Sequence, residues 1–497
     1  MGWSSKRAFA AAFAAGALLA CAAPAAAQIP GVPPLPIPQD PLSSSPTFEG
    51  TPATPAPIRG VPEPPRHPFM APNGRSNIHN DAFMSDVYRG PGPLGDGPEV
   101  STFFARECAS IAFDAQGRIV SICVGLERPV LVLLDPRTLQ TLAAKPLPLR
   151  NFQSGANPFT DFSGGGYFYL DHRDRAVVPT NDRRVLVVAI APGPRLKTVR
   201  SYDLSSQMPA GDGIISILPD WEGGLWFVSR GGLVGTIEPD SGEVRTLRLE
   251  GEGISNSFAV DETGGVYIVS DAAFYRFDAG SGGEPAVSWR QPYPDTEVHK
   301  PGQSDAGSGT TPTVMGRKWV AITDNADPMN VRVYRRTKRP LAQREVCSAP
   351  VFAQGASATD QSLIATNRSI VAENNYGYSV AATAGGRTTT PGLERIDVVE
   401  DGDGHACRKV WSSDEIAPSV VPKLSLAAGL VYTYTKPPGS ATEDPWYLTA
   451  LDFRTGKTVY RRLAGEGLGY NNNYAPVTLG PDGTAYVGVL GGLVALP

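Results

Sequence analysis

The stretch Asp220-Trp221-Glu222-Gly223, followed by apolar Leu225 and Phe227, has the pattern of a tight turn that joins two short buried strands. Similar hairpins turn at 114–117, 261–264 and 481–483, and weaker copies turn near residues 174, 316, 367 and 429. Successive turns are 41 to 62 residues apart, close to the roughly 40 to 50 residues of a four-stranded propeller blade. Small repeated sheets bury their faces by packing against one another, so the sequence predicts an all-β, eight-bladed β-propeller.

The last repeat supplies only three strand-like segments, at 476–479, 484–488 and 492–496. A fourth strand must come from elsewhere if the last sheet is to match the others. Residues 99–104 precede the first complete repeat and have strand composition. We therefore expect them to complete the last blade, to remove an exposed sheet edge and to close a propeller domain over 96–497.

Composition narrows the classes of partner. The chain has 497 residues, 41% of them hydrophobic and 19% charged, with 54 Gly and 47 Pro, which favours a turn-rich fold with a large core. The formal net charge is -5, so nucleic acid is not expected as a partner. We expect a monomer that binds a small-molecule ligand or substrate.

The first 95 residues differ in composition from the rest. Residues 1–27 resemble a signal peptide, with Lys6-Arg7, an apolar run and a small-residue cleavage site at 25–27. We expect a secreted or periplasmic protein with no integral membrane segment after signal removal. Cys21 after Leu18-Leu19-Ala20 gives lipid anchoring as an alternative, and residues 5–9 resemble a twin-arginine signal. Residues 28–95 are interpreted as a Pro-rich linker and lead-in, extended and solvated where 15 prolines occur between Pro30 and Pro72.

Four cysteines remain in the mature chain, an even number that suits an oxidising compartment. Cys108 and Cys123 are equidistant from the turn at 114–117, so they should lie opposite each other on neighbouring strands and form a disulfide. Cys347 and Cys407 fall in the last strands of two consecutive blades, and whether they pair depends on how the blades are spaced. None of the four has the spacing of a zinc or haem site.

Two sets of loops open on the two faces of a propeller. The loops that join strand A to B and strand C to D have ordinary turn sequences, such as Asp240-Ser241-Gly242. The loops that connect one blade to the next, and strand B to C, are rich in carboxylates and carboxamides. Their candidate ligand-binding residues are Asp161, Asp271, Asp327, Asn375, Lys436 and Asn472.

Oxygen-rich loops that converge on one mouth are what Ca²⁺ requires, because it takes six to eight oxygen ligands in loose geometry. The candidate metal ligands are Glu373, Asn374, Asp324, Asn325 and Asn256. Two pairs among them, 324–325 and 373–374, follow directly on apolar strands. The alternative is that these residues cap turns through local hydrogen bonds to the backbone.

The histidines give no clear sign of a metal site or of serine hydrolase chemistry. None of the five has metal-ligand spacing, and no Gly-x-Ser-x-Gly motif accompanies them. His299 lies beside the mouth sequences and is the candidate catalytic proton carrier, with a solvated loop histidine as the alternative.

The segment Ala450-Leu451-Asp452-Phe453-Arg454-Thr455-Gly456-Lys457 resembles the repeat of the quinoprotein (pyrroloquinoline quinone) propeller superfamily, with Tyr460 in place of the usual tryptophan. Partial copies occur at 134–138 and 238–243, and the whole chain is similar to uncharacterised secreted propeller proteins of bacteria. The resemblance implies an eight-bladed fold and, in the dehydrogenases, a quinone between a tryptophan and a vicinal disulfide, with Ca²⁺ held by Glu, Asn and Asp. Adjacent cysteines are absent from this chain, so we expect Ca²⁺ but not pyrroloquinoline quinone.

Three functions remain open. The first is a Ca²⁺-dependent hydrolase that resembles the lactonase group. The second is a quinone-dependent dehydrogenase, against which the missing vicinal cysteines count. The third is a non-catalytic extracellular binding module. The fold alone does not decide among them.

Overall fold

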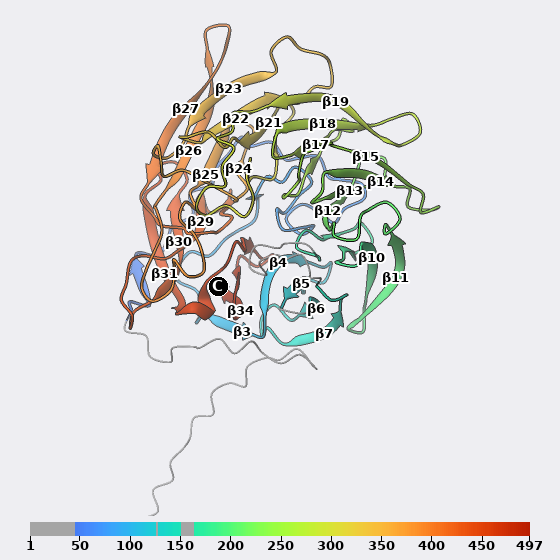
Figure 1. Ribbon diagram of the computed structural model, residues 1–497. Coiled ribbons are helices and arrows are strands. Elements are labelled where there is room, and N and C mark those ends of the chain that lie inside the picture. The colour runs from blue at the N-terminus through green and yellow to red at the C-terminus, as the bar shows by residue number, and fades with distance from the viewer. Residues whose placement is uncertain (1–44, 126–127, 151–163) are drawn as a thin grey trace, which may run out of the picture.

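A computed structural model describes residues 45–125, 128–150 and 164–497. In this part of the chain eight sheets are arranged around a central axis, as Figure 1 shows, and each sheet is built on four antiparallel strands. The predicted eight-bladed β-propeller is confirmed. The predicted signal peptide at 1–27 and the candidate Asp161 lie outside the described residues.

The first four blades are β4–β7 (Glu107–Phe113, Ile119–Val124, Val130–Leu134, Thr141–Pro146), β8–β11 (Tyr169–Leu170, Arg175–Pro179, Arg184–Ala191, Arg195–Asp203), β12–β15 (Ile214–Pro219, Leu225–Ser229, Leu233–Ile237, Val244–Arg248) and β16–β19 (Ala259–Val260, Val266–Val269, Ala273–Ala279, Pro285–Pro292). Blades 5 to 7 are β20–β23 (Thr313–Met315, Trp319–Thr323, Asn330–Arg335, Glu345–Pro350), β24–β27 (Ile364–Ala365, Ser369–Glu373, Leu393–Asp401, Gly404–Ser413) and β28–β31 (Lys423–Ser425, Leu430–Thr435, Pro445–Asp452, Thr458–Glu466). Blade 8 contains β32–β34 (Val477–Leu479, Ala485–Val489, Gly492–Leu496), and a short 3-10 helix, η2 (Leu468–Tyr470), precedes it.

Aspartates fix the tight turn between the first two strands of several blades. Asp220 Oδ1 accepts hydrogen bonds from the backbone N–H groups of Glu222, at 3.0 Å, and Gly224, at 2.8 Å. Its other carboxylate oxygen accepts from the Trp226 indole N–H at 2.8 Å. Asp114 repeats the arrangement in blade 1 with Gln116 and Arg118. These side chains are therefore explained by turn geometry, as the sequence pattern indicates.

Burial decreases from the axis to the rim. All five residues of β13 are buried, whereas the outermost strand β11 has mostly exposed or half-buried side chains, several of them Arg or Lys. Apolar faces of neighbouring blades form the core, and one cluster runs continuously from blade 2 to blade 5. The charged outer strands keep the sheet edges from pairing with other chains.

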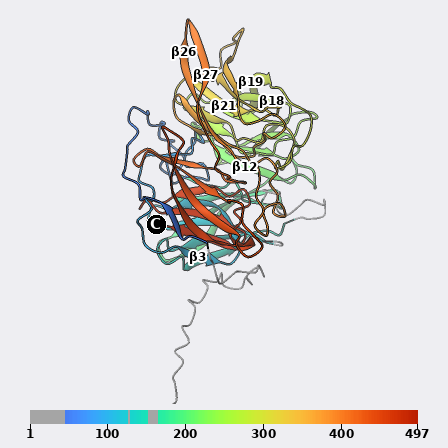
Figure 2. The ribbon, with the colours of Figure 1, turned by 90° about the vertical axis from the view of Figure 1, so that its left-hand side faces the viewer.

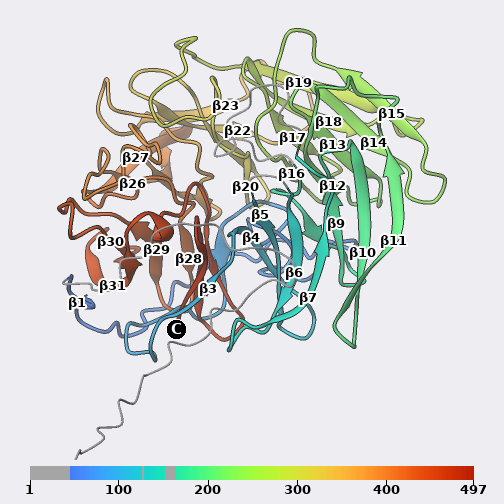
Figure 3. The ribbon, with the colours of Figure 1, turned by 60° about the horizontal axis from the view of Figure 1, so that its bottom comes forward.

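Strand β3 (Ser101–Phe104) is the outermost strand of blade 8. It pairs antiparallel with β34, placing Phe103 opposite Leu493. Both termini of the propeller thus belong to one sheet, with β3 close to the C-terminal end of the chain (Figures 1 and 3). Phe103 is fully buried, so this pairing contributes to the core as well as to the sheet.

The Pro-rich region is solvated in one part and packed in another: residues 51–66 are mostly exposed, as expected, whereas residues 69–88 are mostly buried. Strand β1 (Phe48–Gly50) pairs with the outer strand β31, and β2 (Val87–Tyr88) pairs in parallel with the inner strand β28, so blade 7 has six strands. Between them, Met70 and Phe83 are almost completely buried. Proline-rich composition predicts extended backbone correctly but does not tell whether that backbone packs on a surface.

Residues 69–88, which we call the central segment, run through the middle of the ring. The backbone carbonyls of Ala82, Phe83, Ser85 and Asp86 accept hydrogen bonds from blades 4, 5, 6 and 7 in turn, at 2.9 to 3.0 Å. Positive φ angles at Asn80, Met84 and Asp86 wind the backbone tightly enough to reach successive blades. The Arg75 carbonyl accepts from the Phe113 N–H of blade 1 at 3.3 Å, and the Ala71 N–H donates to the Leu170 carbonyl of blade 2 at 2.9 Å.

An ion pair without solvent exposure fastens the central segment to blade 7. The Lys423 ammonium contacts the Asp86 carboxylate and also donates to the Ile78 carbonyl at 2.8 Å. His79 Nδ1 is 3.1 Å from Asp86 Oδ2. Burial lowers the pKa values of both Lys423 and His79, and the Asp86 charge opposes the shift in each.

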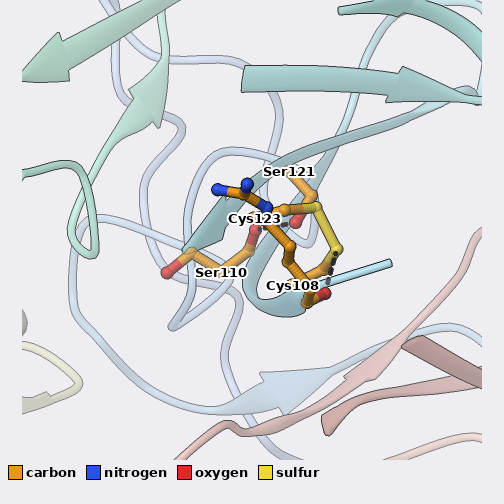
Figure 4. Close-up of a disulfide and its surroundings, with 5 residues drawn as sticks. Cys108, Ser110, Ser121 and Cys123 are labelled. Carbon is orange, nitrogen blue, oxygen red and sulfur yellow. Dashed lines mark hydrogen bonds between the residues drawn. A yellow bond between two sulfur atoms is a disulfide. The ribbon is translucent and has the colours of Figure 1, made fainter. Parts of the chain in front are cut away.

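Both cysteine pairs form disulfides. Cys108 and Cys123 lie directly opposite on β4 and β5, with Cα atoms 4.0 Å apart, as predicted (Figure 4). In the same hairpin the Ser121 hydroxyl donates to the Ser110 carbonyl at 2.7 Å. Cys347 bonds to Cys407 and joins the outer strands β23 and β27 of blades 5 and 6. The long hairpin β26–β27 that carries Cys407 is at the top of the view in Figure 2.

Candidate functional site

The central channel is blocked on the side of the A-to-B turns by the central segment. On the opposite side, beneath the loops between blades, the structure encloses a small cavity of about 60 Å³. Its polar lining comes from separate blades and includes Glu107, Asn256, Asp360, Tyr167 and Tyr474. This volume is room for a few water molecules, well below the roughly 300 Å³ or more of a small-molecule pocket.

The loop of residues 299–308, between blades 4 and 5, covers the cavity. The Tyr474 hydroxyl and the Asn375 side-chain amide both donate to the Gly302 carbonyl, at 2.9 and 2.8 Å. The Ser304 backbone N–H donates to an Asp360 carboxylate oxygen. Contacts with blade 6 and with the approach to blade 8 thus hold one loop over the mouth.

Two acidic side chains meet beneath this loop with few partners. Both carboxylate oxygens of Glu373, at the end of β25, are buried without a well-formed hydrogen bond in the described part of the chain, and so is Oδ1 of Asp360. Burial raises the pKa of Glu373 well above its usual range, and the Asp360 charge adds to the shift, which the nearby Thr359 hydroxyl opposes. Burial raises the pKa of Asp360 to about 7. Unpartnered buried carboxyl groups are costly and mark a candidate site.

A third acid lines the cavity from blade 1. Burial raises the pKa of Glu107, at the start of β4, to about 8, although an Asn473 hydrogen bond and the charge of Arg150 oppose the shift. Asn473 Nδ2 donates to Glu107 Oε2 at 3.3 Å. The lining therefore gathers acidic groups that titrate near neutral pH.

Strained backbone marks the same wall. Asn473 and Tyr474 have φ angles of 40° and 67°, which are rare for a bulky residue such as tyrosine. The Tyr378 hydroxyl donates to Asn471 Oδ1 at 2.9 Å, and the Tyr378 and Tyr474 rings pack edge to face at 5.0 Å. The predicted run of asparagines is therefore buried in a hydrogen-bond network that orients two tyrosines toward the mouth.

The other predicted metal ligands already have protein partners. Asp324 Oδ2 accepts from Arg332 Nε at 2.7 Å and from Asn330 Nδ2 at 2.9 Å. Asn374 caps its own loop, accepting from the Ala358 and Tyr376 N–H groups. Asp324 is therefore held in an ion pair and Asn374 caps its loop, so the oxygens of both already have protein partners.

Asn325 and Asn256 are also engaged. Asn325 Nδ2 donates to Asp295 Oδ1 at 2.7 Å, and its Oδ1 accepts from Gln303. Asn256 lines the cavity, and its amide donates to the Ser308 carbonyl at 3.3 Å. Among the predicted metal ligands that the structure describes, Glu373 has both carboxylate oxygens buried without a well-formed hydrogen bond, and in Asn256 the printed bonds use the amide nitrogen rather than Oδ1.

The predicted ligand-binding residues are spread over several loops. Asn375 Oδ1 is buried and unpartnered, while Asn472 donates to the Ser419 and Ala475 carbonyls. Asp327 is exposed and accepts from the Gly355 N–H at 2.7 Å. Lys436 pairs with Asp444 and lies 5.4 Å from the Trp446 ring centre.

Asp271 and His299 lie nearer to solvent. Asp271 is half-buried, and burial raises its pKa. The exposed His299 contacts the Gln303 carbonyl in the covering loop through Nε2. Neither lines the cavity.

The sequence pattern groups Asp360 with the other mouth residues without singling it out as a ligand, and it does not assign Glu107 to the site. Asp360 precedes the first strand of blade 6, at a mouth position that the face rule identifies, and this position was a usable signal. Glu107 begins an apolar strand and has the sequence context of an ordinary strand terminus. Its role depends on Asn473, from the other end of the chain, which no local pattern reveals.

The donor set limits which metal or cofactor this site could hold. In the described residues no group of three or more His, Cys, Asp or Glu side chains is arranged to hold a metal ion. A cation held by Glu373 and Asp360 would need amide, hydroxyl or water oxygens as its remaining ligands. A quinone sandwich does not fit, because the disulfides join residues 15 and 60 positions apart rather than neighbours, and the cavity is too small.

Comparisons with known proteins support the fold. No sequence-family model matches the chain. An uncharacterised protein of Archaeoglobus fulgidus is 28% identical over 318 residues, which cover 58% of this chain and 61% of that protein, so the chain spans less than two thirds of this relative. The quinohemoprotein alcohol dehydrogenase of Comamonas testosteroni is structurally similar, with a TM-score of 0.51 and 11% identity over 86% of this chain and 80% of that one.

Another solved structure, BamB from Moraxella catarrhalis, has a TM-score of 0.39 and 14% identity over 64% of this chain and 83% of that one. At such identities a structural likeness shows the fold alone. The chain thus has the propeller fold found in a quinoprotein dehydrogenase. In its described part, no helix is long and apolar enough to span a membrane.

Proposed function

We propose that this protein is a Ca²⁺-dependent binding protein, in which an ion held by Glu373 and Asp360 organises the covering loop for capture of a small polar ligand. The observation that carries the proposal is the pair of acidic side chains, Glu373 and Asp360, with three buried carboxylate oxygens that have no well-formed hydrogen bond in the described chain, and Asp360 lines a water-sized cavity. Burial raises the pKa of both carboxyl groups, and a divalent cation bound to them would stabilise their charged forms.

The chemistry of the donors favours Ca²⁺ among common cations. Besides the two carboxylates, Asn375 Oδ1 and Gln361 Oε1 are buried oxygens without partners in the described chain, from residues close in sequence to Glu373 and Asp360. Hard oxygen donors with room for water suit Ca²⁺, whereas zinc and copper prefer nitrogen and sulfur. Six or more ligands then require water molecules, for which the cavity has space.

The position of Asp360 links the ion to ligand capture. Asp360 accepts the Ser304 N–H of the covering loop, so an ion on its other oxygen would fix the loop at the mouth. Loop polar groups and the Tyr474 ring would then form the ligand surface. The cavity is too small for a drug-sized molecule, which supports binding above the ion rather than beside it.

Ca²⁺-dependent hydrolysis is the second candidate. Asp360 and Glu107, with pKa values raised to about 7 and about 8, have the acidities that general acid–base catalysis needs at neutral pH. A substrate must then displace residues 299–308 to reach them, so hydrolysis of lactones or esters should depend on the mobility of this loop.

Isothermal titration of EDTA-treated protein with Ca²⁺ tests the proposal. Wild type should bind one ion, and Glu373→Gln and Asp360→Asn should each weaken binding at least tenfold. Asp403→Asn removes an exposed charge from a distant turn and is the matched control. A wild type that binds no Ca²⁺, or charge variants that bind as wild type does, would refute the proposal.

A further inference from the structure

The opposite face of the ring, formed by the A-to-B turns, carries a much larger cleft of about 880 Å³. Its walls are the turns of blades 5, 6 and 8, the Pro-rich residues 61–65 and part of the central segment. This volume lies within the roughly 300–1,000 Å³ range of small-molecule sites. The cleft is separate from the acidic cavity described above.

Basic side chains dominate the charge of the cleft. Arg75, Arg89, Arg317, Lys318 and Arg368 line it. Arg89 lies 3.5 Å from Glu63, but the side chains of the other four make no ion pair or hydrogen bond with any residue that the structure describes. The whole chain has a formal net charge of -5, yet four cations without an ion pair in the described residues lie around this one cleft.

The acids in the lining do not neutralise these cations. Asp81 is buried and accepts hydrogen bonds from Ser85, and burial raises its pKa to about 7. Glu63 is the partner of Arg89, which leaves Glu400 as the exposed carboxylate beside four unpaired basic groups. The cleft therefore presents a net positive potential to solvent.

The cleft also has a rigid apolar floor. Trp319, Tyr88 and Phe83 line it, and the Trp319 ring packs edge to face against His405 at 5.1 Å. Arg317, Lys318 and Trp319 follow Gly316 directly, so two cations and an aromatic side chain from one turn line the cleft. Guanidinium groups bind phosphate and carboxylate oxygens in a forked geometry, and the aromatic floor excludes water beneath them.

We propose that this cleft is a binding site for a small polyanion, a molecule bearing several phosphate or carboxylate groups that bridge Arg317, Lys318, Arg368 and Arg75. The site is independent of the proposed Ca²⁺ site, because it shares none of its ligands and opens on the other face. Its small-molecule size and rigid floor distinguish it from a flat basic surface.

Titration with tripolyphosphate and with citrate, in Ca²⁺-free buffer after EDTA treatment, tests the site. Wild type should bind at least one of them saturably, with affinity that falls as salt rises, and the stronger probe assigns phosphate or carboxylate chemistry. The variant Arg317→Gln/Lys318→Gln/Arg368→Gln should weaken binding at least tenfold without lowering the melting temperature. Arg75→Gln tests the central-segment side of the cleft alone and should weaken binding severalfold.

The matched control is Arg195→Gln/Lys197→Gln, which removes two exposed charges from the outer strand β11 of blade 2. It should bind as wild type does. The inference is overturned if neither probe binds saturably to wild type, if the triple variant binds unchanged, or if the control loses as much affinity as the triple variant.

Discussion

Removing the charge of Asp86 should detach the central segment from the ring. The Asp86 and Lys423 side chains are both 0% exposed, so water does not screen the interaction between their charges. Truncating one partner of a buried ion pair costs about 3–5 kcal/mol, because the other charge is left buried without compensation. Asp86→Asn is the sharpest change, since Asn keeps the shape and tolerates the positive φ of 56° at this position.

The assay is urea unfolding together with limited proteolysis. We expect Asp86→Asn and Lys423→Met each to lower the free energy of unfolding by about 3–5 kcal/mol, a large share of the roughly 5–15 kcal/mol typical of a folded domain. Cleavage within residues 62–90 should become faster. The double variant leaves no buried charge of this pair, so it should be more stable than the sum of the single losses predicts. Additive losses, or single variants within about 0.5 kcal/mol of wild type, would show that the pair does not hold the segment.

Three further outcomes are expected. Cys347→Ser/Cys407→Ser removes a link across 60 positions and should cost about 4 kcal/mol in unfolding experiments, and a loss below about 1 kcal/mol would contradict its bracing role. Phe103→Ala empties a fully buried position in the closing strand, and it should cost about 3–5 kcal/mol and lower the melting temperature of the whole ring rather than of one blade; a separate early transition would argue otherwise. The raised pKa of Asp360 means that its protonated form stabilises the Ca²⁺-free fold at acid pH, and this contribution is lost as the pH rises from about 4 to about 7. Ca²⁺ must displace that proton, so Asp360 alone should lower the affinity about tenfold per pH unit below 7, in addition to the proton on Glu373, and Asp360→Asn should make the slope shallower in titrations from pH 5.5 to 8.

Much of the fold is legible in the sequence because its determinants are local. The hairpin turns depend on an Asp and a Gly four or fewer residues apart, as at Asp220 and Gly223, and the Cys108–Cys123 pairing follows from counting outward from one such turn. The function of a carboxylate is not local. Asp324 and Glu373 have the same sequence context, an acid after an apolar strand, yet Arg332 pairs with the first and no described basic group pairs with the second.

The central segment escaped prediction for a related reason. Its hydrogen bonds go to residues up to about 340 positions away, such as Leu424 and Leu426, and its proline-rich approach has the composition of a solvated linker. Asp86 and Lys423 carry no mark of their pairing in either local pattern. Long-range partners decided whether this backbone packed, and a single sequence does not display them.

The threading of the ring has a consequence for biogenesis. A ribosome delivers the N-terminal end first, so residues 69–88 emerge before the blade N–H groups that donate to their carbonyls exist, and the last of these donors, in blade 7, follows more than 300 residues later. The backbone carbonyls of this segment therefore lack their blade partners until those blades have been synthesised. The ring can close around this segment only near the end of synthesis. A truncated chain that lacks blades 7 and 8 would therefore keep the segment but could not complete the ring that holds it.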